Sequence, residues 1–515
     1  MTVHLVGAGP GDPGLVTVRG AELLASADVV VHDRLTAAAL LELAPPHAEV
    51  IDVGKAPAGP SVPQEEINAL LVEHGRAGRR VVRLKGGDPF VFARGAEEAA
   101  ALDAAGVDYE VVPGITSAFA APAAAGVPVT LRYSSTHVTV VTGHEDPSKG
   151  STEVDWEAIA RAGGTVVILM GVGRWAAISA RLMDGGLPPD TPAAAVRWGT
   201  TPRQSTVRAT LATLGDHPLA PPSVIVVGRV AREHLDWFER RPLFGRSVVV
   251  TRARDQAPEL ADRLARAGAD VVVAPTIEIA DPGDGGAALR SAVASVAGAD
   301  WVVLTSPNGA RRLCAELRDG RDLAGVSLAA IGPGTAAALA EHHLVADLVP
   351  PRYVAESLLE AFPDPPPGGG RVLLVRAEVA RDVLPDGLRA RGWAVEVVPA
   401  YRTVPVVPPA AARERMMAAD AVVFTSSSTV DNWVAAVGPG APPVVAAIGP
   451  VTAATARGHG MAVAVEAREH TLDGVVEALG AHFAGGSAPG ATGAGGSAPG
   501  ATVAGGAAPG GTGGG

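Results

Sequence analysis

The sequence contains little cysteine, few aromatic residues and no long hydrophobic run. Cys314 is the single cysteine among 515 residues, which excludes a disulfide framework, a cysteine-based zinc site and an iron–sulfur cluster. The thirteen histidines are scattered and none stands in a metal-ligand spacing with acidic partners, so we expect no bound metal. No apolar run reaches the roughly 18 residues of a membrane span, and the start, MTVHLVGAGPG, lacks the features of a signal peptide. These absences predict a cytoplasmic protein that does not contact membranes.

Basic tracts are absent as well. Lys+Arg number 42 and Asp+Glu number 54, so the net charge is −12, which argues against a general nucleic-acid binder. Hydrophobic residues make up 47% of the chain, enough to bury a large core. At about 150 residues per domain, the length indicates about three domains.

Short apolar runs alternate with Ala/Leu-rich helical stretches through most of the chain. This alternation predicts an α/β protein with mostly parallel sheets. A polar helix is expected over 231–241 (AREHLDWFERR), ending at Pro242, and a new strand pattern begins at Gly245. We therefore place the main boundary between domains 1–242 and 243–484.

The second half contains an internal sequence repeat. Residues 299–313 are similar to 419–433, and 328–344 are similar to 445–461, which predicts two related α/β lobes joined by a crossing chain. From Gly485 onward the sequence consists of Gly, Ala, Pro, Ser and Thr with a single valine, Val503, so it has almost no apolar bulk, and it has no charge. We expect a disordered tail over 485–515, because such a segment cannot offset the entropy of its own ordering.

The first candidate site begins with VHLVGAGPGDPGLVT, a strand followed by a Gly/Pro loop and a helix start. A dinucleotide-binding turn is one interpretation, since Asp33 ends the next strand where a ribose-binding acid would stand. Against it, Asp12 replaces the third glycine of that motif, and Pro10 removes a backbone donor that a pyrophosphate needs.

Three further segments offer small-residue turns at strand ends. RLKGGDPFVFARGAEE (83–98) places two glycines and Asp88 after a strand, where a ligand can approach the backbone and Asp88 can cap a helix or accept a hydrogen bond. VVPGITSAFAAPAAAGVP (111–128) contains a turn with the hydroxyls of Thr116 and Ser117, and GTVVILMG (164–171) ends a strand at Met170.

Together with DRL (33–35), VGK (53–55), QEEIN (64–68) and TGH (142–144), these segments resemble the tetrapyrrole methylase family over about residues 2–240. The similarity is closest to uroporphyrinogen-III C-methyltransferase. The resemblance implies two α/β subdomains with the cofactor in the cleft between them, a homodimer, and S-adenosylmethionine as methyl donor. It implies Asp33 as proton acceptor and Lys55 as proton donor. The positions that match cofactor-binding residues are Pro10, Gly86, Gly87, Asp88, Val91, Thr116, Ser117, Met170 and Gly199.

Several positions depart from the family pattern. Lys55 is followed by Ala-Pro where an arginine is usual, FARGAEE lacks a second glycine, and Leu131 stands where a histidine is usual. These changes affect expected substrate contacts more than the cofactor loops. Candidate partners for substrate carboxylates are Arg34, Arg83, Arg94 and Arg132, each of which could equally form a surface ion pair.

The second half has turns but no conspicuous catalytic group. The segments 331–335 and 448–452, and the Ser-rich turns at Ser306 and Ser426, are typical of helix N-termini that bind anions. Two lobes with such turns facing a cleft would suit a polycarboxylate. Ordinary helix caps are the alternative.

The order of motifs over about residues 246–482 resembles uroporphyrinogen-III synthase. That family has two lobes, which we place at 246–279 with 402–484 and at 280–401. The resemblance implies that Tyr401 assists hydroxyl departure and that Thr452 contacts substrate, and we add Ser306 and Ser426 as substrate-binding residues.

The two resemblances fit one pathway, because the product of the second half is the substrate of the first. We expect a bifunctional enzyme that cyclises hydroxymethylbilane to uroporphyrinogen III and methylates it at carbons 2 and 7 to give precorrin-2, for sirohaem or cobalamin synthesis. Three alternatives stay open at this point: methylation of a later corrin intermediate, a half that only binds or senses tetrapyrroles, and a nucleotide-dependent reductase.

Overall fold

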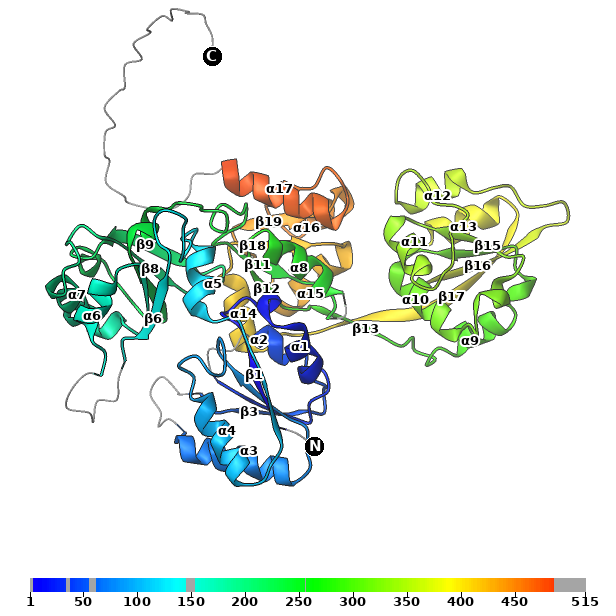
Figure 1. Ribbon diagram of the computed structural model, residues 1–515. Helices are drawn as coiled ribbons and strands as arrows, with labels where there is room; N and C mark the ends of the chain where they lie inside the picture. The colour runs from blue at the N-terminus through cyan, green and yellow to red at the C-terminus, as the bar shows by residue number, and fades with distance from the viewer. Residues whose placement is uncertain (1–2, 34–37, 55–61, 145–152, 255, 486–515) are drawn as a thin grey trace, which may run out of the picture.

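The computed structural model describes residues 3–33, 38–54, 62–144, 153–254 and 256–485. Within these ranges the chain forms four five-stranded sheets, each accompanied by helices (Figure 1). The predicted α/β class is confirmed. Among the described residues, no helix is long and apolar enough to cross a membrane.

The first sheet is parallel throughout, with the order β3-β2-β4-β1-β5. Its strands are β1 (Val3–Gly7), β2 (Val29–His32), β3 (Glu49–Asp52), β4 (Val81–Lys85) and β5 (Tyr109–Val112), and the helices are α1 (Val18–Leu24), α2 (Ala38–Leu41), α3 (Gln64–Arg76) and α4 (Gly95–Ala104). The central strands are apolar runs because helices of the crossover connections cover both faces of a parallel sheet. All five carboxyl ends lie at one edge, where Asp33 follows β2 and Gly86 follows β4.

The second sheet is mixed, with the order β6-β7-β10-β8-β9. Its strands are β6 (Val138–Thr142), β7 (Thr165–Leu169), β8 (Pro192–Arg197), β9 (Ser205–Thr210) and β10 (Ser223–Val227), with helices α5 (Ser117–Ala124), α6 (Trp156–Ala162) and α7 (Trp175–Asp184). Both β7 and β8 run antiparallel to β10, so they point the same way. Met170, after β7, and Gly199, after β8, therefore lie at the same edge.

The polar helix predicted over 231–241 is wrong. A 3-10 turn, η4 (Arg229–Arg232), is followed by turns, and β11 begins at Ser247. The backbone of this segment forms hydrogen bonds with residues far away in sequence. The Arg208 guanidinium donates to the Glu233 carbonyl at 2.8 Å, and the Leu235 N–H donates to the Gly126 carbonyl at 3.2 Å. These bonds replace the local bonds that a helix would make. The boundary after residue 242 stays a prediction.

The third and fourth sheets build the second half. The third has the order β12-β11-β18-β19-β20 and the fourth the order β13-β17-β16-β14-β15. Strands of the third are β11 (Ser247–Val250), β12 (Asp270–Val273), β18 (Ala421–Phe424), β19 (Val444–Ala447) and β20 (Val463–Glu466), with α8 (Ala257–Arg266), α14 (Ala410–Met417), α15 (Ser427–Val437), α16 (Pro450–Gly458) and α17 (Leu472–Gly485). Strands of the fourth are β13 (Ile277–Ala280), β14 (Trp301–Leu304), β15 (Ser327–Ala330), β16 (Gly370–Ala377) and β17 (Trp393–Pro405), with α9 (Ala287–Ala294), α10 (Pro307–Glu316), α11 (Pro333–Ala340), α12 (Ala355–Ala361) and α13 (Val383–Ala390).

A two-stranded ribbon connects these sheets. The chain leaves the third sheet after β12, and the end of β17 returns antiparallel to β13, pairing Ile277 with Pro405 and Ala280 with Arg402 (Figure 1). Both strands run without a break across the lobe boundaries placed at 279/280 and 401/402, and those boundaries stay predictions. The tail beyond α17, residues 486–515, lies outside the described residues, so its disorder also stays a prediction.

Candidate active sites

Three loops of the first sheet are tied together at its carboxyl edge. The backbones of Gly9 and Gly87 exchange two hydrogen bonds, of 3.2 and 2.8 Å, so the loop that contains Pro10 lies beside the loop after β4. The Asp88 carboxylate accepts from the Phe90 N–H at 2.8 Å and from the Gly114 N–H at 3.0 Å. Asp88 thus caps its own turn and fixes the loop after β5.

Glycine is required where these loops meet. A Cβ on Gly114 would lie 2.1 Å from the Gly87 carbonyl oxygen and 2.6 Å from the Gly7 Cα. Gly87 itself has φ +70°, a left-handed conformation that side chains rarely adopt. The edge is therefore lined by closely packed backbone, with Thr116 beyond it as the N-cap of α5, its hydroxyl accepting from the Ala118 N–H at 3.3 Å.

The second sheet adds a loop to the same place. The Asp12 N–H donates to the Thr200 hydroxyl at 3.2 Å, which joins the loop around Pro10 to the loop after β8. Gly199 packs so closely on α5 that a Cβ would lie 2.4 Å from the Ala121 Cβ. The structure thus brings the loops of Pro10, Gly86–Asp88, Thr116–Ser117 and Gly199 together, with Val91 packing partly buried beside α5.

Met170 has an unusual backbone. Its φ is 55°, and its side chain is half exposed at the end of β7. Thr200 has φ 70° as well. Such conformations cost about 1–3 kcal/mol each and gather at functional sites, where the surrounding fold holds them. Met170 is therefore held in an exposed position at the edge that also carries Gly199.

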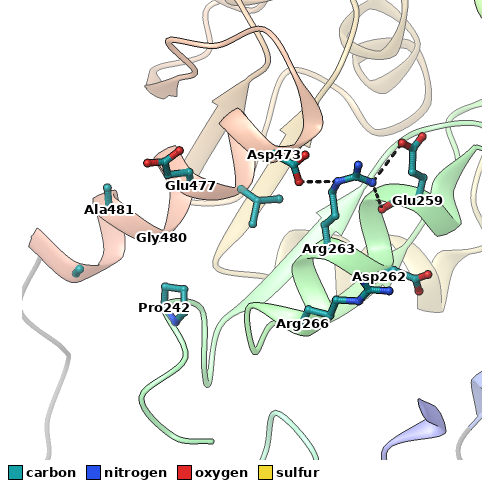
Figure 2. A pocket seen from close by; sticks show the side chains of 11 residues that line it. Pro242, Glu259, Asp262, Arg263, Arg266, Asp473, Glu477, Gly480 and Ala481 are labelled. Atoms are coloured by element: carbon teal, nitrogen blue, oxygen red, sulfur yellow. Dashed lines mark hydrogen bonds and ion pairs between the residues drawn. The ribbon is translucent and has the colours of Figure 1, made fainter. Parts of the chain in front are cut away.

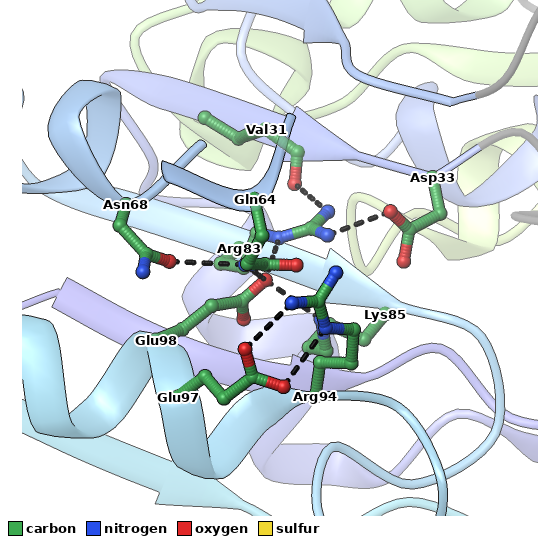
Figure 3. A network of polar contacts seen from close by, with 9 residues as sticks. All are labelled: Val31, Asp33, Gln64, Asn68, Arg83, Lys85, Arg94, Glu97 and Glu98. Atoms are coloured by element: carbon green, nitrogen blue, oxygen red, sulfur yellow. Dashed lines mark hydrogen bonds and ion pairs between the residues drawn. The ribbon is translucent and has the colours of Figure 1, made fainter. Parts of the chain in front are cut away.

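Asp33 belongs to a network of buried charges (Figure 3). Its carboxylate accepts from the Arg83 Nη2 at 2.6 Å, and the Arg83 Nε donates to Glu98 at 3.0 Å. The Arg83 side chain is 2% exposed and that of Glu98 is 0% exposed, while Asp33 is one-third exposed. Arg83 therefore links a carboxylate at the surface to a carboxylate in the core.

Glu98 accepts hydrogen bonds from the other donors of this network. Its Oε1 also accepts from the Lys85 Nζ at 2.8 Å and from the Gln64 amide at 3.3 Å, while its Oε2 has no partner among the described residues. Burial, and after it the charge of Arg83, lowers the pKa of the Lys85 ammonium below its usual value, and Glu98 opposes this. Sequence reasoning missed Lys85 and Glu98. The sequence did contain a signal for this network, because Arg83 and Lys85 stand two positions apart in a buried strand and therefore lie on the same face of the sheet.

The four arginines predicted to meet substrate carboxylates have different surroundings. Arg83 is buried and already paired, which leaves Asp33 rather than Arg83 open to solvent. Arg94 pairs with Glu97 at 2.6 Å on the surface, and Arg132 stacks 5.0 Å from the centre of the Tyr133 ring. Arg34 and Lys55 lie outside the described residues.

In the second half, Tyr401 and Ser306 lie together. The Tyr401 hydroxyl donates to the Ser306 Oγ at 3.0 Å, and that oxygen also accepts from the Gly309 N–H as the N-cap of α10. Burial raises the pKa of the Tyr401 phenol above its usual value, and its hydrogen bonds with Ser306 and Asn308 oppose this rise. The phenol therefore stays protonated at neutral pH. Asn308, which sequence reasoning missed, also bonds to Gln256 of the third-sheet side.

Ser426 and Thr452 lie at the N-terminal ends of two helices, α15 and α16, that follow strands of the third sheet. Ser426 is the N-cap of α15 in a capping box with Thr429, and Thr452 is 5% exposed in the first turn of α16. Both predicted serines therefore act as helix caps, the alternative interpretation of their turns. Substrate binding by Ser306, Ser426 and Thr452 stays a prediction.

A hollow of about 830 Å³ lies elsewhere, between α8 and α17 (Figure 2). None of the predicted site residues lines it. Its Arg263 is already paired, with Asp473 at 2.7 Å and with Glu259 at 3.2 Å. We do not assign it to either active site.

Comparisons with known proteins identify two families in this chain. Residues 2–215 match the family of tetrapyrrole (corrin/porphyrin) methylases, and residues 258–477 match uroporphyrinogen-III synthase HemD. The porphyrin biosynthesis protein HemD of Ruminiclostridium josui is 37% identical over 448 residues, which are 84% of this chain and 88% of the relative.

Other relatives match about half of this chain. A uroporphyrinogen-III C-methyltransferase of Bacillus subtilis (strain 168) is 45% identical over 279 residues, 53% of this chain and 58% of the relative. A crystal structure of uroporphyrin-III C-methyl transferase from Thermus thermophilus, complexed with S-adenyl homocysteine, is 41% identical and covers 45% of this chain and 99% of its own, with a TM-score of 0.40. Since the Ruminiclostridium relative spans both halves, the chain belongs to the family of HemD-type porphyrin biosynthesis proteins in which a tetrapyrrole methylase is fused to a uroporphyrinogen-III synthase.

Proposed function

We propose that this chain is a bifunctional enzyme that cyclises hydroxymethylbilane to uroporphyrinogen III and then methylates that product at carbons 2 and 7, giving precorrin-2. The observation that carries the proposal is the presence of both family matches, 2–215 and 258–477, in one chain. The product of the second half is the substrate of the first, so the fusion places consecutive reactions on one molecule.

The methyl donor in this proposal is S-adenosylmethionine, which supplies an electrophilic methyl group on a sulfonium centre when bound. The residues proposed to hold it are Pro10, Gly86, Gly87, Asp88, Val91, Thr116, Ser117, Met170 and Gly199. The glycine-lined edge fits such a ligand, because closely packed backbone offers hydrogen bonds without bulk. Pro10 supplies no N–H, which suits a ligand without a phosphate.

Asp33 is the proposed proton acceptor. Methylation of a pyrrole carbon leaves the macrocycle with a proton to lose, and a carboxylate at a strand end can take it. Arg83 restrains this carboxylate through the 2.6 Å ion pair while leaving it one-third exposed. Lys55 is the proposed proton donor.

Tyr401 is the proposed proton donor of the cyclisation. Its phenol stays protonated at neutral pH and can donate to the departing hydroxyl of hydroxymethylbilane, which leaves as water. Ser306, Ser426 and Thr452 are proposed to hold the substrate from the two sheets, so that the reactive chain end is folded and steered. We further propose that the chain acts in the cytoplasm as a homodimer through its first half and needs no metal.

One reaction tests both assignments. Purified protein would receive hydroxymethylbilane and S-adenosylmethionine without oxygen, with products followed by mass spectrometry. We expect a doubly methylated tetrapyrrole from the wild type and uroporphyrinogen III alone from Asp33→Ala, a loss of about 10²–10⁴-fold in methylation. Tyr401→Phe should yield more uroporphyrinogen I, and supplied uroporphyrinogen III should restore its methylation. A wild type whose only cyclised product is uroporphyrinogen I would refute the cyclase assignment.

A further inference from the structure

A second, smaller hollow of about 200 Å³ lies at the carboxyl edge of the fourth sheet. Thr305 follows β14 in it, Ile331 follows β15, and Arg376 stands near the end of β16. In open parallel sheets, ligands bind outside the carboxyl ends of the strands. Tyr401 also lines this hollow, so it adjoins the proposed site of hydroxyl departure.

The charged residues among its lining are both arginines, Arg376 and Arg381. Arg376 is 9% exposed, which is uncommon for an arginine without a fully paired guanidinium. Its Nη1 donates to the Arg381 carbonyl at 2.9 Å and its Nη2 to Asp382 at 2.7 Å, while its Nε has no partner among the described residues. The Nε–Nη2 edge of a guanidinium can bind a carboxylate through two parallel hydrogen bonds. In Arg376, one of these two donors, Nε, is unpaired among the described residues.

The partners of both arginines are exchangeable. The Asp382 side chain, which occupies Nη2, is 66% exposed and can return to water at little cost. Arg381 is 65% exposed, and its contact with Glu356 is long, at 3.6 Å. Each arginine can turn to an incoming anion while its present partner becomes hydrated.

The remaining walls are apolar. They are formed by Ile331, Ala355, Leu374, Ala377, Ala380, Leu384 and Pro385. A hollow with apolar walls and a cationic end matches a carboxylate carried on a short alkyl arm. Its volume is too small for a tetrapyrrole.

We propose that this hollow is a subsite for one carboxylate-bearing side arm, acetate or propionate, of the linear tetrapyrrole that the second half cyclises, with Arg376 as its principal anchor and Arg381 as a second one. The proposal rests on the proposed cyclase function and adds to it which residues bind an arm. An arm held beside Tyr401 would fix the position of the chain end that loses its hydroxyl.

The test uses the full chain, whose methylase half reports on folding. The variants are Arg376→Gln and Arg381→Gln, with Arg389→Gln as control, since Arg389 lies on α13 outside the lining and pairs with Asp386. Because a charge-assisted hydrogen bond contributes about 1.5–3 kcal/mol, we expect the KM for hydroxymethylbilane to rise about tenfold or more in Arg376→Gln. A smaller rise is expected in Arg381→Gln, with kcat changed less than KM in both. Uroporphyrinogen I, the product of closure off the enzyme, should increase.

A second variant avoids disturbing the buried arginine. Asp382→Asn replaces the carboxylate that competes for Nη2 by a neutral and weaker acceptor, and we expect a KM equal to or below that of the wild type. Methylation of supplied uroporphyrinogen III should stay unchanged in all variants.

The proposal is overturned by a wild-type KM in both arginine variants, by a lowered kcat at unchanged KM, or by a raised KM in Asp382→Asn. A wild type that converts hydroxymethylbilane to uroporphyrinogen I alone would overturn the cyclase function and the subsite together. Wild-type turnover with insensitive variants would overturn the subsite alone.

Discussion

At the scale of single residues, Glu98 is the most consequential side chain of the first half. It holds Arg83 and Lys85, both 2% exposed, and through Arg83 it reaches Asp33. Replacing Glu98 by glutamine would leave Arg83 with Asp33 as its carboxylate partner and would replace the carboxylate that holds Lys85 by a neutral amide. Buried charges that lose their partner cost about 3–5 kcal/mol.

We therefore expect Glu98→Gln to lower the local stability of β4 and α4 by about 3–5 kcal/mol. Hydrogen exchange of peptides from these two elements, followed by mass spectrometry, measures this change. The matched control is Glu97→Gln, the neighbouring glutamate, which pairs with Arg94 on the surface and should change stability by about 0.5 kcal/mol or less. Equal effects of the two substitutions would contradict the assigned role of the buried network.

Lys85 gives this network a pH dependence. Its pKa in the folded state is lowered from 10.5, so as pH rises through the folded value the native protein releases a proton that the unfolded chain still binds. Stability must then increase with pH in the window between the lowered pKa and 10.5, because the unfolded state binds more protons there.

The measurement is the first-half unfolding temperature of wild type and Lys85→Met at pH values from neutral to 10. The difference between the two proteins isolates Lys85 from other titrating groups. We expect the wild type to gain stability relative to Lys85→Met as the pH rises. A constant difference across this range would show that Lys85 does not titrate in it.

At the scale of elements, the carboxyl edge of the first sheet depends on loops that touch through their backbones. We expect Gly114→Ala to force the loops after β1 and β4 apart, since the new Cβ would lie 2.1 Å from the Gly87 oxygen. Overpacking of this kind costs about 1–3 kcal/mol. Because this cost falls on the loop conformation proposed to bind S-adenosylmethionine, affinity should fall by about 5- to 150-fold.

Isothermal titration calorimetry of S-adenosylmethionine with each variant provides the check. Gly173→Ala is the control, because a Cβ there meets no atom within 4 Å and its φ is not left-handed. Tight binding by Gly114→Ala would mean that these loops do not form the cofactor site.

At the scale of the whole molecule, the two halves have separate sheets and separate cores. A ligand of one half should therefore stabilise that half alone. With S-adenosylhomocysteine at a hundred times its dissociation constant, mass action predicts about 2.7 kcal/mol of added stability.

Hydrogen exchange resolves where this stabilisation appears. We expect added protection in β1 and β4 and unchanged exchange in β18 and β19. Equal protection in both regions would reveal that the halves unfold as one unit, against the boundary placed after residue 242.

Sequence patterns were enough to predict the α/β class, the positions of the strands around the first site and both family resemblances. Apolar runs and Gly/Pro turns are local patterns, so they can be read without knowing what packs against them. The same local information predicted the strand ends that carry Asp33 and Met170. Parallel pairing of β2 with β4 then placed the loop of Asp33 at the edge that also carries Gly86.

Which of these groups meet depends on how the whole chain packs. The predicted helix over 231–241 fails because Arg208 and Gly126, far away in sequence, take its backbone groups. The pairing of Arg83 with Glu98 and Asp33, and of Tyr401 with Ser306, depends on segments brought together by sheet order. Contacts of this kind are set by packing across the whole fold, and a local pattern of residue types does not encode them.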